Sequence, residues 1–340
     1  MPEPTSRQGG RPDNYLTNVA LRYGIAMGNV YIADKVFPVA PVNQSAAKYK
    51  VFPRSYFMRD EVAVRPLGGT PRVVGYRLSE ESYFAEEEAL RAKIDVRERV
   101  DAGGTPGHDI ERAKTELLMS QHLIHRDRRW ASEFFKTGVW GTDLTGVASG
   151  TPTSSQFLRW DNDNSNPIKE ISTRAFGVGQ KVGGAYRPRT LVLGVDVFIA
   201  LQSHPLILDR MADSEARVID NQVLANFFGV DRVLVPQGVV NTGPEKESVA
   251  ATEAAAVYQY IVDTKDALLV YSAPRPSTEM PSGGYVFAWT GLLGTMAFDP
   301  TAAVTRGRDD SYSDWIDVRV AYDMKVTAPE LGVFFDNAVT

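Results

Sequence analysis

Residues 189–210 read RTLVLGVDVFIALQSHPLILDR and residues 221–241 read NQVLANFFGVDRVLVPQGVVN, and these two stretches decide the fold class of the chain. Each combines a short apolar run, typical of a buried strand, with a longer segment of helical spacing. Gly229 follows the second helical segment, where glycine commonly ends a helix. The predicted elements are a strand at 190–193, a helix at 195–203, a helix at 221–228 and a strand at 232–235. Strand and helix in turn indicate an α/β unit.

The rest of the C-terminal half predicts further strands. Residues 237–257, QGVVNTGPEKESVAATEAAAV, predict an exposed loop. The apolar or alternating segments at 267–271, 285–298, 315–326 and 333–339 predict strands. We expect the last two to return and pair beside a long helix that comes earlier in the chain.

That long helix is predicted at 109–137. Asp109 or a neighbour can cap its first turn, and Gly138 follows its end. About 28 residues span roughly 40 Å as a helix. Apolar residues recur at spacings of three, four or seven at Ile110, Ala113, Leu117, Ile124, Ala131 and Phe135, and Leu118 and Phe134 widen this stripe. The opposite face carries Glu111, Arg112, Lys114, Arg126, Asp127 and Arg128. A polar connector at 141–166 and a helix from Pro167 follow.

The N-terminal part predicts segments that need a partner. Residues 1–48 contain a few apolar clusters separated by prolines, a pattern that favours an arm lying on a neighbour. Residues 49–85 form two β-rich runs around Leu67-Gly68-Gly69-Thr70, which predicts a long hairpin. An isolated two-stranded hairpin is marginally stable in water. We therefore expect the hairpin to lie on another subunit.

The hairpin and the segment after it differ in charge. Residues 48–78 carry seven basic and two acidic side chains, a net charge of +5, whereas residues 79–101 carry four basic and eight acidic ones, a net charge of −4. A basic surface of one subunit could thus meet an acidic surface of the next. A solvated surface of mixed charge is the alternative interpretation.

Composition excludes several classes of protein. The chain has 340 residues, 43% of them hydrophobic and 23% charged, as is ordinary for a globular protein. It contains no cysteine, so disulfides and thiolate metal sites are excluded. No run approaches the roughly 18 apolar residues of a membrane span, and the N-terminus lacks the apolar core of a signal peptide. A net charge of −5 argues against a nucleic-acid binder.

The search for catalytic or metal-binding residues finds no complete set. His122 and His125 are one helical turn apart but lack an evident third ligand. The run 161–166, DNDNSN, resembles the start of a calcium loop, but Asn166 stands where that loop needs glycine. The glycines at 177–184 lie in and after a helix, and no G-K-[ST] follows them. No nucleophile, base and oxyanion donors assemble.

The order of these segments carries a resemblance. Its most specific residues are LQSHP at 201–205, FGV at 228–230, the proline- and glycine-rich run 273–289, and YDMKV at 322–326. With the arm, basic hairpin and long helix before them, they resemble a tailed-bacteriophage major capsid protein of the Hong Kong 97 capsid fold family. The resemblance implies an α+β fold with these parts: an N-terminal arm (1–48), an extended β-hairpin loop (49–85), a peripheral domain with a spine helix at 109–137 and a connector (86–185), an α/β axial domain (186–300), and return strands of the peripheral domain (301–340).

The same resemblance implies a structural function and no enzymatic activity or cofactor. The chain would self-assemble into the hexamers and pentamers of an icosahedral phage head that encloses double-stranded DNA without sequence-specific binding. The implied partners are other copies, a separate scaffolding protein, a portal and, as a further candidate, a decoration protein. The implied location is the virion, assembled in the cytoplasm of a host bacterium, with no membrane association.

Candidate inter-subunit residues follow from the charge contrast. The basic set is Arg54, Arg59, Arg65, Arg72 and Arg77, and the acidic set is Glu80, Glu81, Glu86, Glu87 and Glu88. Some family members form an isopeptide bond from a lysine of the extended loop to an asparagine. The hairpin tip here has arginines and no lysine, and this departs from the crosslinking pattern.

Two alternative functions remain open from the sequence. The first is an encapsulin-like compartment shell, which has the same fold and holds a cargo enzyme. The second is a soluble α/β enzyme whose site carries no recognisable motif.

Overall fold

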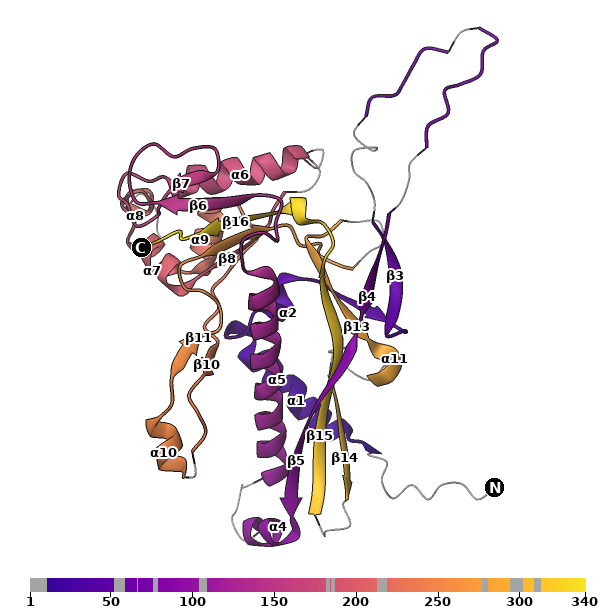
Figure 1. Ribbon diagram of the computed structural model, residues 1–340, viewed down its shortest axis with the longest axis vertical. Coiled ribbons are helices and arrows are strands. Elements are labelled where there is room, and N and C mark those ends of the chain that lie inside the picture. Colours follow the sequence, from indigo (N-terminus) through magenta and orange to yellow (C-terminus); the bar gives the residue numbers. More distant parts are fainter. Residues whose placement is uncertain are drawn as a thin grey trace.

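The computed structural model describes residues 11–51, 59–65, 67–75, 79–103, 109–181, 184, 187–212, 219–246, 248–276, 281–293, 302–308 and 313–340. Helices and strands are mixed along the chain and build two six-stranded sheets (Figure 1). We name the sheets after their central strands, the β12 sheet and the β15 sheet. The predicted α+β class is confirmed.

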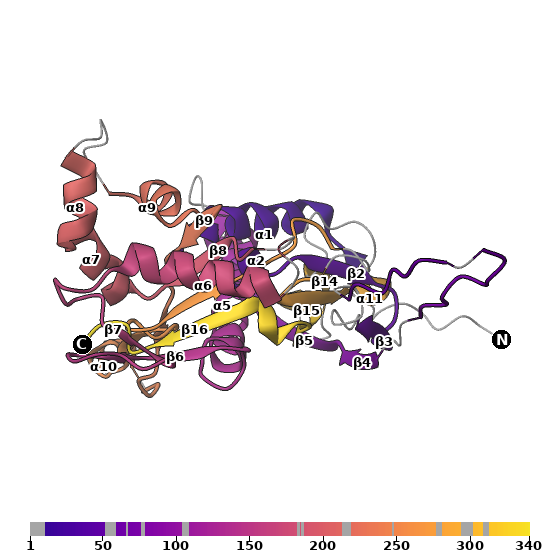
Figure 2. The ribbon, with the colours of Figure 1, turned by 90° about the horizontal axis from the view of Figure 1, so that it is seen from above.

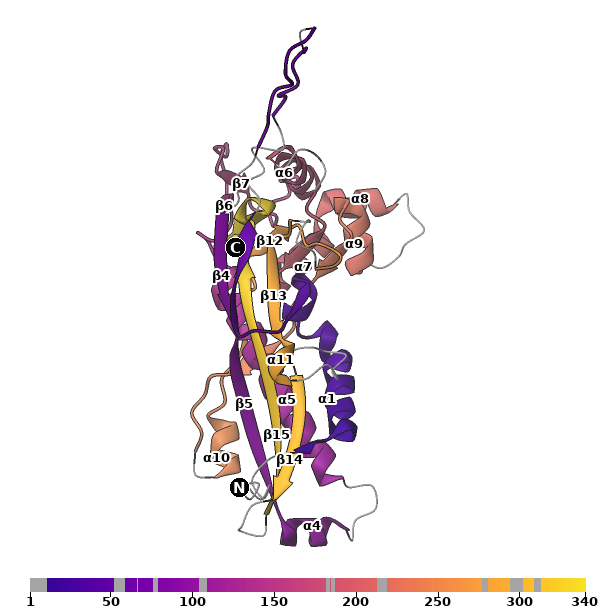
Figure 3. The same ribbon diagram turned by 90° about the vertical axis from the view of Figure 1, so that its right-hand side faces the viewer.

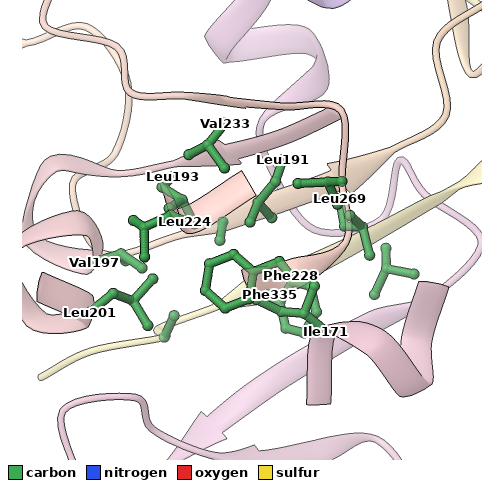
Figure 4. Close-up of a cluster of buried hydrophobic side chains, with 14 of the residues drawn as sticks. Ile171, Leu191, Leu193, Val197, Leu201, Leu224, Phe228, Val233, Leu269 and Phe335 are labelled. Carbon is green, nitrogen blue, oxygen red and sulfur yellow. The ribbon is translucent and has the colours of Figure 1, made fainter. Parts of the chain in front are cut away.

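The β12 sheet contains the strands predicted by the two opening sequences. Its order is β7 (Gln156–Leu158), β6 (Asp143–Val147), β16 (Gly332–Asp336), β12 (Ala267–Val270), β8 (Thr190–Leu193) and β9 (Arg232–Leu234). On one face, side chains such as Leu191 and Phe335 pack against three helices, as Figure 4 shows. These helices are α6 (Pro167–Lys181), α7 (Val195–Ser203) and α9 (Asn221–Phe228). Every residue of β8 and β12 is buried because both faces of the sheet are covered.

The long helix α5 (Ile110–Phe134) covers part of the other face. Trp130 and Phe134, near its C-terminal end, belong to the same buried cluster as Leu268 and Phe334 of the β12 sheet. At 25 residues the helix is about 37 Å long. Its N-terminal part runs along the second sheet, so one rigid rod connects the two cores.

The β15 sheet has the order β1 (Arg11–Pro12), β14 (Ala302–Arg308), β15 (Ser313–Val326), β13 (Gly284–Trp289) and β2 (Val39–Val42). Strand β5 (Glu86–Asp95) pairs with β15 along ten residues, from Ser313↔Asp95 to Tyr322↔Glu86. Helices α5 and α1 (Asn14–Ala26) lie on one face of this sheet (Figure 3). The short pair β3 (Ala46–Val51) and β4 (Ser79–Phe84) packs on the other.

The remaining elements are short. They are η1 (Met27–Asn29), α2 (Ala33–Val36), α4 (Val96–Gly103), α8 (Pro205–Ala212), β10 (Val239–Asn241), α10 (Val249–Ala254), β11 (Tyr258–Tyr260), α11 (Thr290–Leu293) and η2 (Pro329–Leu331).

Three strand predictions are corrected by the structure. The terminal strand β16 is separate from β15 and pairs with β12 and β6 in the β12 sheet, where its Phe334 packs against the C-terminal end of α5. The polar connector 141–166 contributes β6 and β7 to the same sheet. The strand predicted at 285–298 ends at Trp289, where α11 begins, and it lies in the β15 sheet. Strand β16 is buried at four of its five residues, which suits a covered central position rather than a half-exposed edge.

The buried face of α5 also differs from the prediction. Asp109 caps the helix as expected, since its carboxylate accepts the Arg112 N–H at 3.1 Å. Leu118 and Phe134 are buried as predicted, but Leu117 is 56% exposed, and Leu123, which was not predicted, is buried. Arg126 and Asp127, predicted on the solvent face, are buried too. The buried face of α5 thus includes the polar residues Arg126 and Asp127, and a search for regularly spaced apolar residues cannot identify them.

Asp127 fastens the N-terminal segment to the long helix. Its two carboxylate oxygens accept the backbone N–H groups of Ile32, at 3.0 Å, and Ala33, at 2.9 Å, at the start of α2. Neighbouring Arg126 forms an ion pair with Asp34 of the same segment. Burial raises the pKa of Asp127 to about 6, although the two N–H bonds and Arg126 favour its charged form. The first turn of α2 is therefore capped by another helix.

We expect Asp127→Ala to lower the free energy of unfolding by about 2 to 5 kcal/mol, because it leaves two buried N–H groups without an acceptor. Hydrogen exchange at residues 30–37 should accelerate with it. Denaturant unfolding of the unassembled protein measures the first effect. Arg128→Ala, on the exposed face of the adjacent turn, is the matched control. Equal stability of the two variants would contradict the capping role.

The same carboxyl makes stability depend on pH. Its folded pKa, about 6, lies above the ordinary 3.8, so the folded chain binds the proton more tightly than the unfolded chain. The stabilising contribution is complete below pH 3.8 and is lost as the pH rises through 6. We expect the stability difference between wild type and Asp127→Asn to shift by up to about 3 kcal/mol across this window. Thermal melts at several pH values measure it, and parallel curves would count against the assignment.

Candidate assembly surfaces

The predicted hairpin is an extension that leaves the body of the subunit. Strands β3 and β4 form its base, from Ala46↔Phe84 to Val51↔Ser79. Beyond these strands, the described segments 59–65 and 67–75 extend away from the body of the subunit and form no strand pairs. The chain turns back at Leu67–Gly68 (Figure 1). Gly68 has a φ of 78°, a left-handed conformation that glycine adopts without strain. Figure 2 shows the extension pointing away from the β12 sheet and its helices.

The extension exposes apolar side chains. Val62, Val64, Leu67 and Val73 are each more than 90% exposed. Apolar side chains gathered on one exposed segment mark a contact surface. We call the described residues of this extension, 59–65 and 67–75, the hairpin tip.

The base of the hairpin, by contrast, is anchored firmly. Tyr83 stacks on Phe287 of the β15 sheet, with ring centroids 4.5 Å apart. The backbone N–H of Phe84 donates to the buried carboxylate of Asp323 at 2.9 Å. Tyr49 donates its hydroxyl to Glu81 at 2.7 Å, and burial with this bond raises the pKa of Tyr49. The hairpin therefore leaves the body from a fixed position.

The predicted arginines divide into two groups. Arg54 and Arg77 lie outside the described residues. Arg59 and Arg72 each approach Glu61, at 3.9 and 3.8 Å, through side chains that stay about 60% exposed. Arg65 lies within the hairpin tip, two residues before Leu67, and is exposed. Contact of these arginines with another subunit stays a prediction.

Four of the five predicted glutamates have partners in their own chain. Glu80 pairs with Lys48 at 3.4 Å, and Glu81 accepts the Tyr49 hydroxyl. Glu87 and Glu88 are successive residues of β5 and point to opposite faces of the sheet. Glu87 pairs with Arg319 at 3.2 Å. Glu88 lies 3.7 Å from Arg129 and 3.4 Å from His125. Glu86 is exposed. An inter-subunit role for this set stays a prediction.

Sequence reasoning missed the charged residues of β15 that hold β5 and the hairpin. Asp317 accepts two bonds from Arg91, at 2.6 and 2.7 Å, while the guanidinium lies 4.1 Å from the Trp315 ring centroid. Asp323 accepts from Arg129 at 3.2 Å and from the hairpin backbone. Charged residues within an otherwise apolar strand were the available signal.

A second protruding segment comes from the predicted exposed loop. Strands β10 and β11 pair antiparallel and carry α10 between them, and we call residues 239–260 the ribbon. It hangs beside α5 on the side opposite to the hairpin (Figure 1, orange, lower left). Tyr258 and Tyr260 of the ribbon are 64% and 47% exposed.

Chemical sites that the sequence raised have structural roles in the described chain. His122 is buried against the Val318 carbonyl, 3.0 Å away, and desolvation lowers its pKa. In the 161–166 turn, Ser165 contacts His204 at 3.1 Å, and the Asp161 carboxylate accepts the Thr340 N–H. Among the described residues no three His, Asp or Glu side chains gather as metal ligands, and no helix is long and apolar enough for a membrane span.

A cavity of about 770 Å³ lies between α2 and the β8–β9 edge. Its charged lining is largely paired, since Arg189 meets Asp231 at 3.1 Å and Arg232 donates to the Thr190 hydroxyl at 2.9 Å. The lining offers no nucleophile with an adjacent base among the described residues.

Comparison with known proteins agrees with this arrangement. The chain is 24% identical over 336 residues to the major capsid protein of Pseudomonas phage JBD67, covering 96% of this chain and 97% of that protein. It is 21% identical over 229 residues to the major capsid protein of Burkholderia phage BcepMu, covering 67% of this chain and 69% of that protein. No family model matches the sequence.

Solved structures share the fold. A phage-related protein from Bordetella bronchiseptica superposes with a TM-score of 0.70 at 21% identity, covering 97% of this chain and 99% of that one. The capsid of cyanophage P-SCSP1u superposes with a TM-score of 0.55 at 10% identity, covering 91% and 88%. The resemblance found in the sequence thus extends to the whole fold. The chain has the Hong Kong 97 capsid fold and is similar along nearly its whole length to a phage major capsid protein.

Proposed function

We propose that this chain forms the hexamers and pentamers of an icosahedral phage head that encloses double-stranded DNA. The observation that carries the proposal is the hairpin tip, whose apolar side chains project beyond the body and find no cover on their own subunit. Burying each large apolar side chain on a neighbour contributes about 1.5 to 3 kcal/mol. Such a segment is useful only where copies meet.

Each part of the fold then has a place in the shell wall. The rod α5, packed into both cores, stiffens the subunit. The β12 sheet with its helices, drawn mainly from residues 143–270 and 332–336, forms the axial domain and meets its copies around the local symmetry axis. The hairpin, residues 49–85, reaches an adjacent subunit. The arm predicted at 1–48 does not do so in its described part, because its apolar anchors, such as Leu16 and Phe37, are buried in the cores of their own subunit.

The net charge of −5 suits a wall that encloses DNA without gripping it, because tight electrostatic binding to the polyanion would oppose release. The protein then acts by assembly and not by catalytic turnover. Its partners are other copies, a separate scaffolding protein, a portal and a candidate decoration protein. Its place is the virion, assembled in the bacterial cytoplasm.

Reversing the charge of the hairpin tip tests the role of its arginines. We expect Arg59→Glu, Arg65→Glu and Arg72→Glu together to abolish closed shells while the isolated subunit still folds, since all three positions are exposed. Negative-stain microscopy and sedimentation measure shell yield, and circular dichroism measures folding. Normal shells from this variant would rule out an electrostatic role for the hairpin tip.

A matched control carries the same charge change elsewhere. Arg128→Glu, Lys136→Glu and Lys169→Glu replace three other exposed cations. We expect this variant to assemble with at least half of the wild-type yield. Equal loss of shells in both variants would assign the effect to total charge and not to the hairpin.

A further inference from the structure

We infer that the ribbon is the surface of each subunit that receives the hairpin tip of the neighbouring copy. The inference rests on the proposed function, because it needs copies assembled side by side. It goes beyond the proposed function because that function does not by itself assign a role to residues 239–260.

One face of the ribbon is apolar, aromatic and uncovered. In its register Val239 faces Tyr260, and Asn241 faces Tyr258, so these four side chains lie on the same face. Val239, Tyr258 and Tyr260 are 37%, 64% and 47% exposed. A two-stranded ribbon of three residues per strand is marginal in water and gains stability when a further segment packs on it.

The ribbon is complementary to the hairpin in charge. Residues 239–260 carry Glu245, Glu247 and Glu253 against Lys246, a net charge of −2, whereas the hairpin tip carries Arg59, Arg65 and Arg72 against Asp60 and Glu61, a net charge of +1. Glu253 lies beside the aromatic face, because it accepts the Tyr258 hydroxyl at 3.3 Å. Arginine side chains pair with carboxylates and also stack on tyrosine rings. The tip offers arginines next to valines, and the ribbon offers glutamates next to tyrosines.

The positions of the two segments decide how they meet. The hairpin leaves on one side of α5, and the ribbon hangs on the other (Figure 1). In a dimer with a twofold axis, the same side of both subunits faces the interface, so a hairpin on one side could not meet a ribbon on the other. The contact between hairpin tip and ribbon is therefore heterologous, or head to tail. Repeated head-to-tail contacts close into a ring.

The hairpin is long enough for this contact. From Val51, at the base, to Gly68, at the turn, an extended chain reaches at most roughly 60 Å. This exceeds the length of α5, about 37 Å. The hairpin can therefore extend beyond its own subunit by a distance comparable to the length of α5.

Crosslinking tests the contact directly, because the chain has no cysteine of its own. Assembled shells of Val73→Cys/Tyr258→Cys are treated with a short bismaleimide, which tolerates a wider separation than a disulfide does. We expect a covalent ladder that ends at the pentamer or hexamer on a denaturing gel. The control Val73→Cys/Val100→Cys places the second thiol on α4, outside the ribbon, where Val100 is 69% exposed, and should stay monomeric.

A charge swap between the ribbon and the hairpin tip tests the same contact without a crosslinking reagent. We expect Glu245→Arg/Glu253→Arg to reduce shell yield at least tenfold, and Arg65→Glu/Arg72→Glu added to the same chain to restore at least half of it. Shells that form without the crosslink, together with no rescue by the swap, would overturn the inference and leave the proposed function intact. Failure of the unmodified protein to form shells at all would instead overturn the proposed function.

Discussion

Strand β15 is the constraint on which the arrangement of the protruding segments depends. Its fourteen residues pair with β5 along one edge and with β14 and β13 along the other. Through these ladders it holds the start of the arm, which pairs with β14, and the strand that follows the hairpin. Asp323 adds a buried acceptor for the hairpin backbone. Segments from three distant parts of the chain thereby take fixed directions from a single strand.

The two cores are rigidly related because α5 belongs to both. Its first half packs through Leu118, Met119 and Leu123 against the β15 sheet and α1. Its last turns place Trp130 and Phe134 against the β12 sheet. A shell needs this stiffness, since each neighbour contact transmits its load through the subunit to the next. In the proposed shell, the exposed segments would bind neighbouring subunits and the packed rod would keep the distance between them.

Local patterns in the sequence predicted the elements well and their partners poorly. The strands at 190–193 and 232–235, the helix starting at Asp109 and the turn at Leu67–Gly68 follow from short-range periodicity and capping. The position of β16 does not, because its pairing with β12 is a contact between distant segments. The glutamates show the same limit: Glu87 is paired with Arg319, 232 residues away. The sequence shows that the segment 80–88 is acidic, but only the fold shows which of these carboxylates already form ion pairs within their own subunit.

The cap on α2 has a consequence for the order in which the subunit can form. A helix of four residues cannot persist alone, because nucleation costs more than so few bonds return. Its acceptor, Asp127, lies 95 residues after Ile32 in the chain. During synthesis the arm emerges from the ribosome first, yet its docking site exists only after α5 has been made and folded. The N-terminal segment is thus translated first but can fold onto its docking site only after residues more than 90 positions later have been made.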